Sequence, residues 1–444
     1  TITVDGLLIV GSETGMVKVD EQTVVEKGRV GPGQMVAVNL AEGKFYRDVE
    51  LKEWLARSRP FGDWTKNITV IDQIVKADAE PKQELSRDEL RRRMLAVGWT
   101  LEDLELILHP MVEDAKEAVG SMGDDTPIAV LSDKYRGLHH FFRQNFSQVT
   151  NPPIDSLRER RVMTLRTRLG NLGNILDEDE AQCRMLQLES PVLTTAEFEA
   201  MRAYMGDTVV EIDCTFDPAS GEFALRDALK RVQREAEDGV RGGAVHVILS
   251  DRAQGGGRAP IPMILAAGGV HTHLVRQQLR TFTSLNVRTG ECMDVHFFAV
   301  LIGVGATTVN AYLAEEAIAD RHARGLFGNM VLKDCVERFR KAIDDGLLKV
   351  MSKMGISIIS SYRGGYNFET VGLSRTLISE FFPGMTSRIS GIGLVGIQKK
   401  VRDLHERAWR EDVVALPVGG FYRFRKSGEA HFWEGELIHV LQRA

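Results

Sequence analysis

The sequence predicts an α/β protein, a central domain of βα units preceded by an N-terminal all-β segment. From about Val209 onward, short apolar runs typical of buried strands alternate with amphipathic runs typical of helices, which favours a parallel sheet. The first 50 residues instead combine clusters of β-branched residues with glycine-rich turns. The 444 residues, 43% hydrophobic and 27% charged, are enough for two or three domains and a large core.

The β-rich opening is predicted to form two or three short hairpins. The turn sequences DG, GSETG and GPGQ divide it, because glycine and small polar residues favour tight turns. Between the turns, β-branched residues alternate or cluster as they do in strands. The stretches expected to be strands are residues 4–10, 16–19 and 34–38.

Residues 51–120 are predicted to be mainly helical. Ser86 and Thr100 are residue types preferred at helix N-caps, and Glu102 and Asp103 suit the first turn after Thr100. Leucine and isoleucine recur at helical spacing after this cap, which predicts one buried face. The sequence SMGDDTPIAVLSD that follows predicts a turn leading into a short buried strand.

Strand and helix patterns then alternate along the chain. A strand at 208–216 precedes a helix at 223–239, and a strand at 242–252 precedes a helix at 261–280. Residues 294–321 predict another strand, turn and helix, and the sequence GISIISSYRGG follows a further long helical run. About four such units would form part of a barrel or of an open sheet, with any site expected in the loops after the strand ends.

Two further stretches are interpreted as connections. The acidic and then apolar sequence DEDEAQCRMLQLES at 177–190 predicts a solvated connection, and the polar sequence at 423–439 predicts the start of another unit. We expect a piece of a longer polypeptide, because Thr1 opens what resembles the middle of a β-structure and the last residues form an apolar run.

Composition argues against several classes of function. The net charge of −6 provides no basic field for nucleic acid or an anionic membrane. No apolar run approaches the roughly 20 residues that cross a bilayer, and no charged-then-apolar leader opens the chain. The cysteines are far apart in sequence, so we expect buried, inert thiols in a reducing, cytoplasmic setting. They are Cys183, Cys214, Cys292 and Cys335.

The sequence IGVGATTVN is a candidate phosphate-binding loop. It places Gly303 and Gly305 after a predicted strand and before a predicted helix, and amides at such a helix start can bind phosphate. The dinucleotide fingerprint, however, needs a third glycine where this chain has Thr308. Tight packing between strand and helix is the favoured interpretation.

Three histidines are candidate metal ligands. His271, His273 and His296 lie near predicted strand ends, and a His-x-His pair can bind a metal ion. No carboxylate or cysteine completes a recognisable spacing, so hydrogen-bonded or solvent-facing histidines are favoured.

Other loops carry weaker signals. Three glycines at 255–257 lie between arginines, which suits an anion but favours a flexible surface loop. Asp124 and Asp125 beside Met122 suit a metal ion but are common in turns. Arg363 suits an anion or a ring contact, with structural packing as the default. No Ser-His-Asp order, nucleophile elbow or P-loop stands out, so the residues alone predict no assembled active site.

A stiff, uncharged segment runs from Val149 to Ile154. Pro152 and Pro153 fix their own backbone angles, and proline disfavours helix at the residue before it. The segment is therefore expected to be extended and to display its backbone carbonyls.

Several stretches, in one collinear order along nearly the whole chain, resemble the large (alpha) subunit of bacterial glutamate synthase. The resemblance implies the end of a class II glutamine amidotransferase domain at 1–66, the central domain at 67–420 and the start of an FMN-binding barrel at 421–444. The stretches are RVGPGQMVAVNL, SMGDDTPIAVLSD, FSQVTNPPIDSLRE, GNLGNIL, SPVLT, IPMILAAGGVHTHLVRQ, LIGVGATTVNAYLA, KVMSKMGISIISSYRGG and LPVGGFYRFRKSGEAHFWEGELIH.

The resemblance implies a reaction in two halves. Glutamine is hydrolysed to glutamate and ammonia, and the ammonia travels inside the protein to 2-oxoglutarate, where FMN reduces the 2-iminoglutarate to a second glutamate. Electrons come through iron–sulfur clusters, including a 3Fe–4S cluster, from NADPH and FAD on a small (beta) subunit, or from ferredoxin in some relatives; an oligomer is expected. The amidotransferase nucleophile, the 2-oxoglutarate-binding residues and the three cluster cysteines have no counterpart in this chain.

Three residues acquire roles by resemblance alone. Thr150 and Asn151 are expected to line the ammonia tunnel, where an uncharged wall with fixed carbonyls suits neutral NH3 better than ammonium. Met122 is expected near the flavin, as a soft apolar side chain against the ring. A packing turn remains the alternative for Thr150 and Asn151.

Two other classes of function stay open. The chain is alternatively a stand-alone, non-catalytic structural or interaction protein derived from the central domain. A third hypothesis is an independent α/β enzyme with its own site near Gly303 and His296, which would need a bound cofactor or metal ion.

Overall fold

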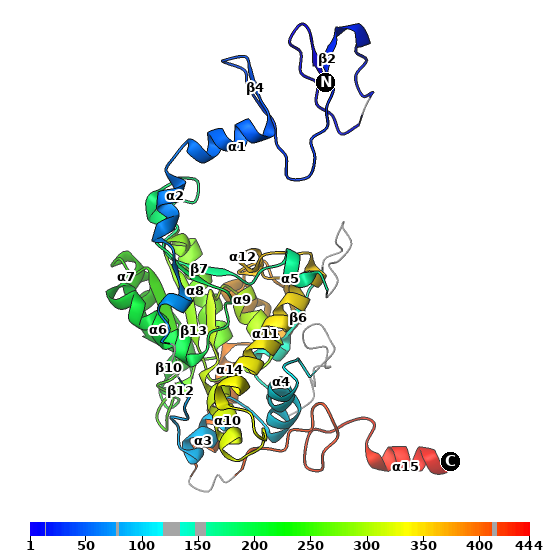
Figure 1. The fold of residues 1–444 in the computed structure, drawn as a ribbon. Coiled ribbons are helices and arrows are strands. Elements are labelled where there is room, and N and C mark those ends of the chain that lie inside the picture. Colours follow the sequence, from blue (N-terminus) through cyan, green and yellow to red (C-terminus); the bar gives the residue numbers. More distant parts are fainter. Residues whose placement is uncertain (14, 77–79, 119–133, 147–156, 411–414) are drawn as a thin grey trace. The chain divides into compact units, whose positions relative to one another are not determined.

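The computed structural model describes residues 1–444 except 14, 77–79, 119–133, 147–156 and 411–414. The described chain divides into two compact units, Thr1–Asn67 and Ile68–Ala444 (Figure 1). None of the described helices is both long and apolar enough to span a membrane.

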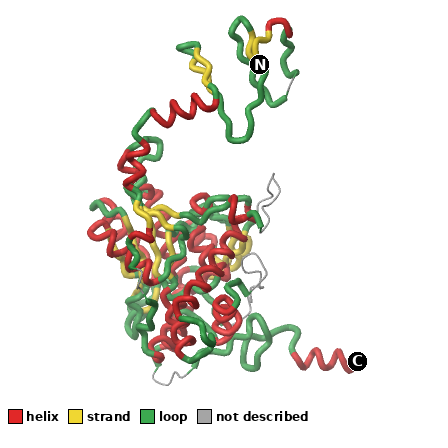
Figure 2. The backbone as a smooth tube through the Cα atoms, viewed as in Figure 1, coloured by secondary structure: helices red, strands yellow, loops and turns green. Residues whose placement is uncertain are grey.

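The first unit contains two small antiparallel strand pairs followed by helices (Figure 2). The prediction of a strand at 16–19 is wrong, because Met16 and Val17 lie in irregular, exposed chain without a neighbouring strand. Residues 4–10 contribute only an isolated bridge between Leu8 and Ile2. The elements are β1 Ile2–Thr3, β2 Val24–Glu26, β3 Ala37–Asn39, β4 Lys44–Tyr46, α1 Asp48–Arg57 and α2 Phe61–Trp64.

The second unit is built on a four-stranded parallel sheet, which confirms the α/β fold class. Its strands lie in the order β9–β11–β13–β14, so each strand pairs with the one before it in the chain. The long amphipathic α7 and the buried α8 connect the first three strands, as the sequence predicts. The elements are β9 Val209–Asp213, α7 Ala224–Arg241, β11 His246–Ser250, α8 Met263–Arg276, β13 Ser284–Arg288, α9 Val295–Gly303, β14 Thr308–Asn310 and α10 Tyr312–Ala323.

One prediction in this region is wrong, and one strand was missed. The apolar run at 295–303 forms helix α9 rather than a strand, and every residue of α9 is buried. A helix that is apolar on all sides shows no helical periodicity, so its sequence resembles a buried strand. The third strand of the sheet is instead β13, whose mixed sequence SLNVR carried no strand signal.

Smaller sheets flank this one. The order β5–β8–β7 places β8 in the centre of a three-stranded sheet with its leucines buried, so 177–190 is not only a solvated connection. A second three-stranded sheet has the order β16–β15–β6, and β10 pairs with β12. The strands are β5 Thr69–Val70, β6 Phe142–Gln144, β7 Thr167–Leu169, β8 Leu186–Leu188, β10 Thr215–Phe216, β12 Ala259–Pro260, β15 Phe368–Leu373 and β16 Thr386–Ile392.

The predicted helix caps are present. Ser86 accepts a hydrogen bond from the Glu89 amide at the start of α3, and Thr100 accepts one from the Asp103 amide. The helical run after Thr100 contains a π-helical stretch, Asp103–Leu108. The other helices are α3 Arg87–Ala96, α4 His109–Glu113, α5 Glu159–Val162, α6 Thr195–Met205, α11 Leu332–Met354, α12 Ile359–Tyr362, α13 Arg375–Phe381, α14 Leu394–Ala408 and α15 Gly435–Arg443.

Candidate functional site

The carboxyl ends of the parallel strands are where an α/β domain of this kind usually places its site. Asp251 follows β11, and Arg288 and Asn310 end β13 and β14. All three side chains are buried. The sheet therefore brings together a carboxyl, a guanidinium and an amide that are far apart in sequence.

Asp251 is held by the loop after β13. Its carboxylate accepts a hydrogen bond from Thr289 Oγ1 at 2.6 Å and from the Gly290 amide at 3.0 Å. Burial raises the pKa of Asp251, while these two donors act in the opposite direction. Both hydrogen bonds come from the chain itself, so this carboxyl positions a loop.

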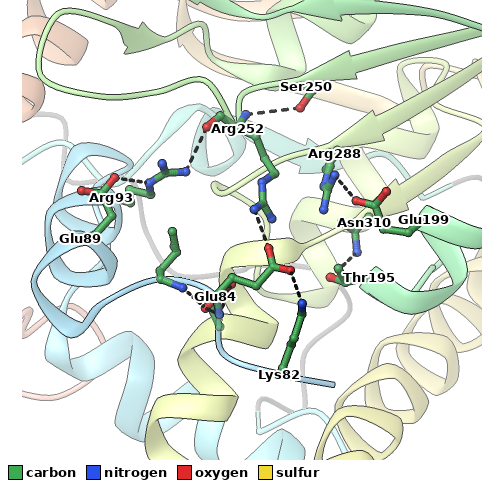
Figure 3. Close-up of polar contacts among 12 residues, drawn as sticks. Lys82, Glu84, Glu89, Arg93, Thr195, Glu199, Ser250, Arg252, Arg288 and Asn310 are labelled. Carbon is green, nitrogen blue, oxygen red and sulfur yellow. Dashed lines mark hydrogen bonds and ion pairs between the residues drawn. The ribbon is translucent and has the colours of Figure 1, made fainter. Parts of the chain in front are cut away.

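The arginines at this edge are each paired (Figure 3). Arg252 Nη2 lies 2.8 Å from Glu84 Oε2, and its guanidinium lies 5.1 Å from the centre of the Tyr312 ring. Arg288 Nη1 lies 2.7 Å from a carboxylate oxygen of Glu199. Pairing of this kind compensates the cost of burying a charge.

The segment at 82–93 packs against the same edge of the sheet. Glu316 accepts hydrogen bonds from the amides of Glu84 and Leu85. Arg93 Nη1 donates to the Arg252 carbonyl at 3.1 Å, while its Nε donates to Glu89 at 2.7 Å (Figure 3). The chain's own side chains thus line this edge, although Arg288 Nε and Asn310 Oδ1 are buried there without a hydrogen-bond partner among the described residues.

A small polar cavity lies next to the C-terminal end of α3, where Val97 and Gly98 line it. Its volume is about 20 Å3, room for roughly one water molecule. Burial raises the pKa of the Glu291 carboxyl in its wall to about 8, although the Met263 amide donates to it at 2.6 Å. Trp99, Asp103 and Phe421 also line the cavity, which is too small for an organic substrate.

Glu102 anchors the segment that leads towards the C-terminal helix. Its fully buried carboxylate accepts hydrogen bonds from four successive amides, those of residues 420–423, at 2.5–3.2 Å. Gly419 and Gly420 have φ values of +84° and +89°, which only glycine adopts readily, and these turn the amides towards the carboxylate. The adjacent glycines were the signal available in the sequence, and the prediction missed this contact.

The residues with roles implied by resemblance lie outside the described residues. These are Met122, Thr150 and Asn151. Asp124 and Asp125, which were candidates from the sequence alone, also lie outside them. The chain before and after 147–156 is described, and on each side a backbone amide donates a hydrogen bond to a carbonyl within residues 357–367. The Asn145 amide donates to the Asn367 carbonyl at 3.0 Å, and the Thr164 amide donates to the Ser357 carbonyl at 2.9 Å.

The glycines at 303 and 305 serve packing, and the prediction that they follow a strand and precede a helix is wrong. They lie at the C-terminal end of α9, which leads into strand β14. A Cβ at Gly303 would lie 2.4 Å from Phe368 Cε2, and one at Gly305 would lie 2.3 Å from His271 Cγ. Phosphate binding would require amides at the start of a helix, so close packing explains these glycines.

The three candidate histidines have separate partners, and none lies at a strand end. His271 and His273 are on α8 and His296 is on α9. His271 Nδ1 accepts from Arg280 Nε at 3.0 Å, and His273 Nε2 lies 2.6 Å from Glu237 Oε2. His296 Nε2 lies 3.0 Å from two backbone carbonyl oxygens. Hydrogen-bonding partners, rather than a shared metal ion, account for their positions.

The cysteines and the glycine loop also have structural explanations. Cys214, Cys292 and Cys335 are buried, and burial raises the pKa of the Cys292 thiol. Cys183 is only partly buried, so the prediction of a buried thiol is wrong for this residue. Across the described residues, no three side chains of the His, Cys, Asp or Glu type form a metal-binding group. In the loop at 255–257, the Gly255 carbonyl accepts a hydrogen bond from His405, and the arginines on both sides pair with carboxylates.

The parallel sheet and the polar contacts at its carboxyl edge define an α/β domain. Residues 92–374 match the family model of the glutamate synthase central domain, and residues 1–64 match that of class-II glutamine amidotransferases. The first match covers more than half of the chain. The chain belongs to the glutamate synthase central domain family.

Individual relatives agree with this assignment. The chain is 70% identical to the glutamate synthase [NADPH] large chain of Azospirillum brasilense, over 100% of this chain and 29% of the relative. It is 37% identical to the glutamate synthase [NADPH] large chain of Bacillus subtilis, over the same shares of each. It is 36% identical to the chloroplastic ferredoxin-dependent glutamate synthase of Spinacia oleracea, over 100% of this chain and 28% of the relative. The chain therefore spans less than a third of the length of these relatives.

Proposed function

We propose that this chain is part of a glutamate synthase, which forms two glutamates from glutamine and 2-oxoglutarate with reductive transfer of ammonia. The observation that carries the proposal is the order of the matches, with an amidotransferase segment at 1–64 before a central domain at 92–374. The identity of 70% to an NADPH-dependent large chain extends over the whole chain. We assign 1–66 to the amidotransferase, 67–420 to the central domain and 421–444 to the start of the FMN domain.

Within that enzyme, the chain connects the two catalytic parts. The edge of its parallel sheet is occupied by ion pairs such as Arg252–Glu84 and Arg288–Glu199, which supports a non-catalytic role for this domain. Glu102 fixes the segment that would continue into the FMN domain. The chain alone is expected to be inactive.

We place the ammonia path at Thr150 and Asn151. The sequence around them has no charge between Val149 and Ile154, and Pro152 restricts the backbone before it. Backbone carbonyls accept hydrogen bonds from NH3, whereas a carboxylate in the wall would favour ammonium, which cannot attack a carbonyl carbon. The described chain on each side of 147–156 bonds to residues 357–367, which would give the path a fixed support.

The cofactors of the proposed enzyme belong mainly to other parts of it. The described cysteines do not fit a 3Fe–4S cluster, because no three metal-binding side chains of the described chain come together. FMN would supply hydride for the reduction, and Met122 near the flavin stays a prediction. NADPH and FAD would act on the small (beta) subunit, which is the proposed partner. The oligomeric state and a cytoplasmic location also remain predictions.

The tunnel proposal is tested in the full-length enzyme with Thr150→Trp. We expect glutamine hydrolysis to continue while glutamate formation from 2-oxoglutarate falls at least about tenfold, because a bulky ring blocks passage of ammonia. Glutamate formation driven by added ammonium chloride should fall much less, since the reductive site is intact. Stoichiometric assays of glutamine consumed and glutamate formed measure both.

Thr376→Trp is the matched control, because Thr376 lies exposed on α13. It should leave both stoichiometries unchanged. If Thr150→Trp keeps one glutamate formed from 2-oxoglutarate for each glutamine hydrolysed, the tunnel assignment fails. The family assignment would stand in that case.

A further inference from the structure

A group of basic side chains lies at the amino-terminal edge of the parallel sheet, opposite the edge described above. It consists of His271 on α8, Arg280 just after α8, and Arg363 just after α12. Arg280 donates from Nε to His271 Nδ1 at 3.0 Å, and from Nη1 and Nη2 to the carbonyls of Thr283 and Gly305 at 2.6 and 2.9 Å. Its charge is therefore held by neutral acceptors.

In the described chain, Arg363 has two buried guanidinium nitrogens without a hydrogen-bond partner, Nε and Nη2, whereas Arg136, Arg288 and Arg321 each have one. Burial, and after it the charge of Arg280, lowers the pKa of Arg363 to about 10. Even so, the guanidinium is charged at neutral pH, so unsatisfied donors and an uncompensated charge remain at one place.

No described carboxylate compensates this group. The charges that act on His271 are those of Arg280 and Arg363, and burial together with these charges lowers the pKa of His271 to about 3. His271 is therefore neutral, and the two guanidinium groups form no ion pair with a described acidic side chain. Two nearby positive charges without a counter-ion call for an anionic group from elsewhere.

The group is rigidly built. The His271 ring lies between Gly305 and Gly364, whose φ values are +120° and +67°. A Cβ at Gly305 would lie 2.3 Å from His271 Cγ, and one at Gly364 would lie 2.9 Å from His271 Cε1. Only glycine fits both positions, so the ring and the turn that carries Arg363 are fixed together.

Exposed apolar side chains surround this turn. Ile358, the residue before α12, forms a β-bridge to Thr164, and Figure 1 shows α12 beside α5. After α12, the Asn367 carbonyl accepts a hydrogen bond from the Asn145 amide. Ile358, Phe146 before 147–156 and Val162 at the end of α5 are 44%, 45% and 51% exposed. An arginine among exposed apolar side chains is typical of the central part of a protein interface.

We propose that Arg363 is a docking point for a carboxylate side chain carried by the part of the parent polypeptide outside residues 1–444. The chain spans 29% of the length of a 70% identical relative, so most of the parent lies beyond it and is available to cover this surface. A carboxylate matches the fork of guanidinium donors and supplies the missing negative charge. The proposal does not depend on the ammonia path.

The partner is identified in the full-length enzyme with Arg363→Lys and a water-soluble carbodiimide. The introduced amine lies within reach of the proposed carboxylate, so a zero-length amide cross-link should form, and peptide mass spectrometry should find an Asp or Glu outside 1–444. Arg388→Lys is the matched control, because Arg388 is an exposed arginine whose partner, Glu369, is known. A cross-link from position 363 to Asp155 or to any other residue of this chain would overturn the proposal.

A second measurement uses the unmodified enzyme, in case Arg363→Lys does not fold. An electron cryo-microscopy map of the full-length enzyme should place an Asp or Glu carboxylate from outside residues 1–444 within hydrogen-bonding distance of the Arg363 guanidinium. A water molecule, a free anion or a carboxylate of this chain in that place would overturn the proposal.

Discussion

At the scale of single residues, the pH dependence of stability should reflect a buried histidine. His246 begins β11, and its Nδ1 lies 2.8 Å from Ser284 Oγ. Burial lowers the pKa of His246 to about 4, below the usual value of about 6.5 for an unfolded chain. Between these two values the unfolded chain binds a proton that the folded protein does not. Stability from this residue is therefore complete above pH ~6.5 and is lost as pH falls towards ~4.

The prediction concerns His246→Asn, whose amide can bond to Ser284 but does not titrate. The free energy of unfolding of the wild type, relative to the variant, should fall by up to roughly 1.4 kcal/mol for each pH unit below about 6.5. Thermal unfolding of the full-length protein at several pH values measures this difference. Parallel profiles of the two proteins would show that His246 is protonated in the folded state. Burial also lowers the pKa of His271, so His271 should contribute the same pH dependence of stability to the wild type and to the variant.

Residue chemistry predicted part of the candidate site. The N-caps at Ser86 and Thr100 follow from local hydrogen bonding and were predicted correctly. Asp251, Arg288 and Asn310 were not predicted, because they meet only when three strand ends are aligned. The strand that ends at Arg288 was missed, so no pattern in the sequence brought these three residues together.

At the scale of elements, one buried carboxylate should hold the C-terminal segment of the described chain. Replacing Glu102 by Ala removes the acceptor of the four amides at 420–423. A hydrogen bond to a charged group contributes roughly 1.5–3 kcal/mol. A loss of about 3 kcal/mol in the opening free energy corresponds to roughly 100-fold faster amide exchange at these residues. Hydrogen–deuterium exchange of the full-length protein measures it.

Glu105→Ala provides a comparison on the same helical run. Glu105 pairs with Arg425 at 2.8 Å, on the segment that Glu102 also holds, but the pair is at the surface. Surface pairs contribute about 0.2–1 kcal/mol, so exchange at 420–423 should change less than about tenfold. Equal effects of the two substitutions would contradict the anchoring role of Glu102.

Helix and strand assignments from sequence succeeded where one face is polar. Helix α7 has a charged face and an apolar face, and the sequence predicted it. Helix α9 is buried on all sides, and its residues were assigned to a strand. Burial on every side depends on what packs around an element, which the local sequence does not contain.

At the scale of the whole molecule, the relatives predict a much longer native polypeptide. An antibody raised against this segment should detect a protein several times heavier than 49.5 kDa in the source cells, because the chain spans 29% of its relative. Flavin and iron should co-purify with it. A band at 49.5 kDa without flavin would instead support a stand-alone structural protein.

The strand order of the central sheet has a consequence for how the protein is made. Since β9, β11, β13 and β14 pair in chain order, each strand finds its partner already synthesised when it leaves the ribosome. The pair of β5 with β8 instead joins residues 69–70 to 186–187, so β5 must wait until more than a hundred further residues have emerged. The central sheet can thus grow one strand at a time during translation, while its flank is completed by a long-range contact.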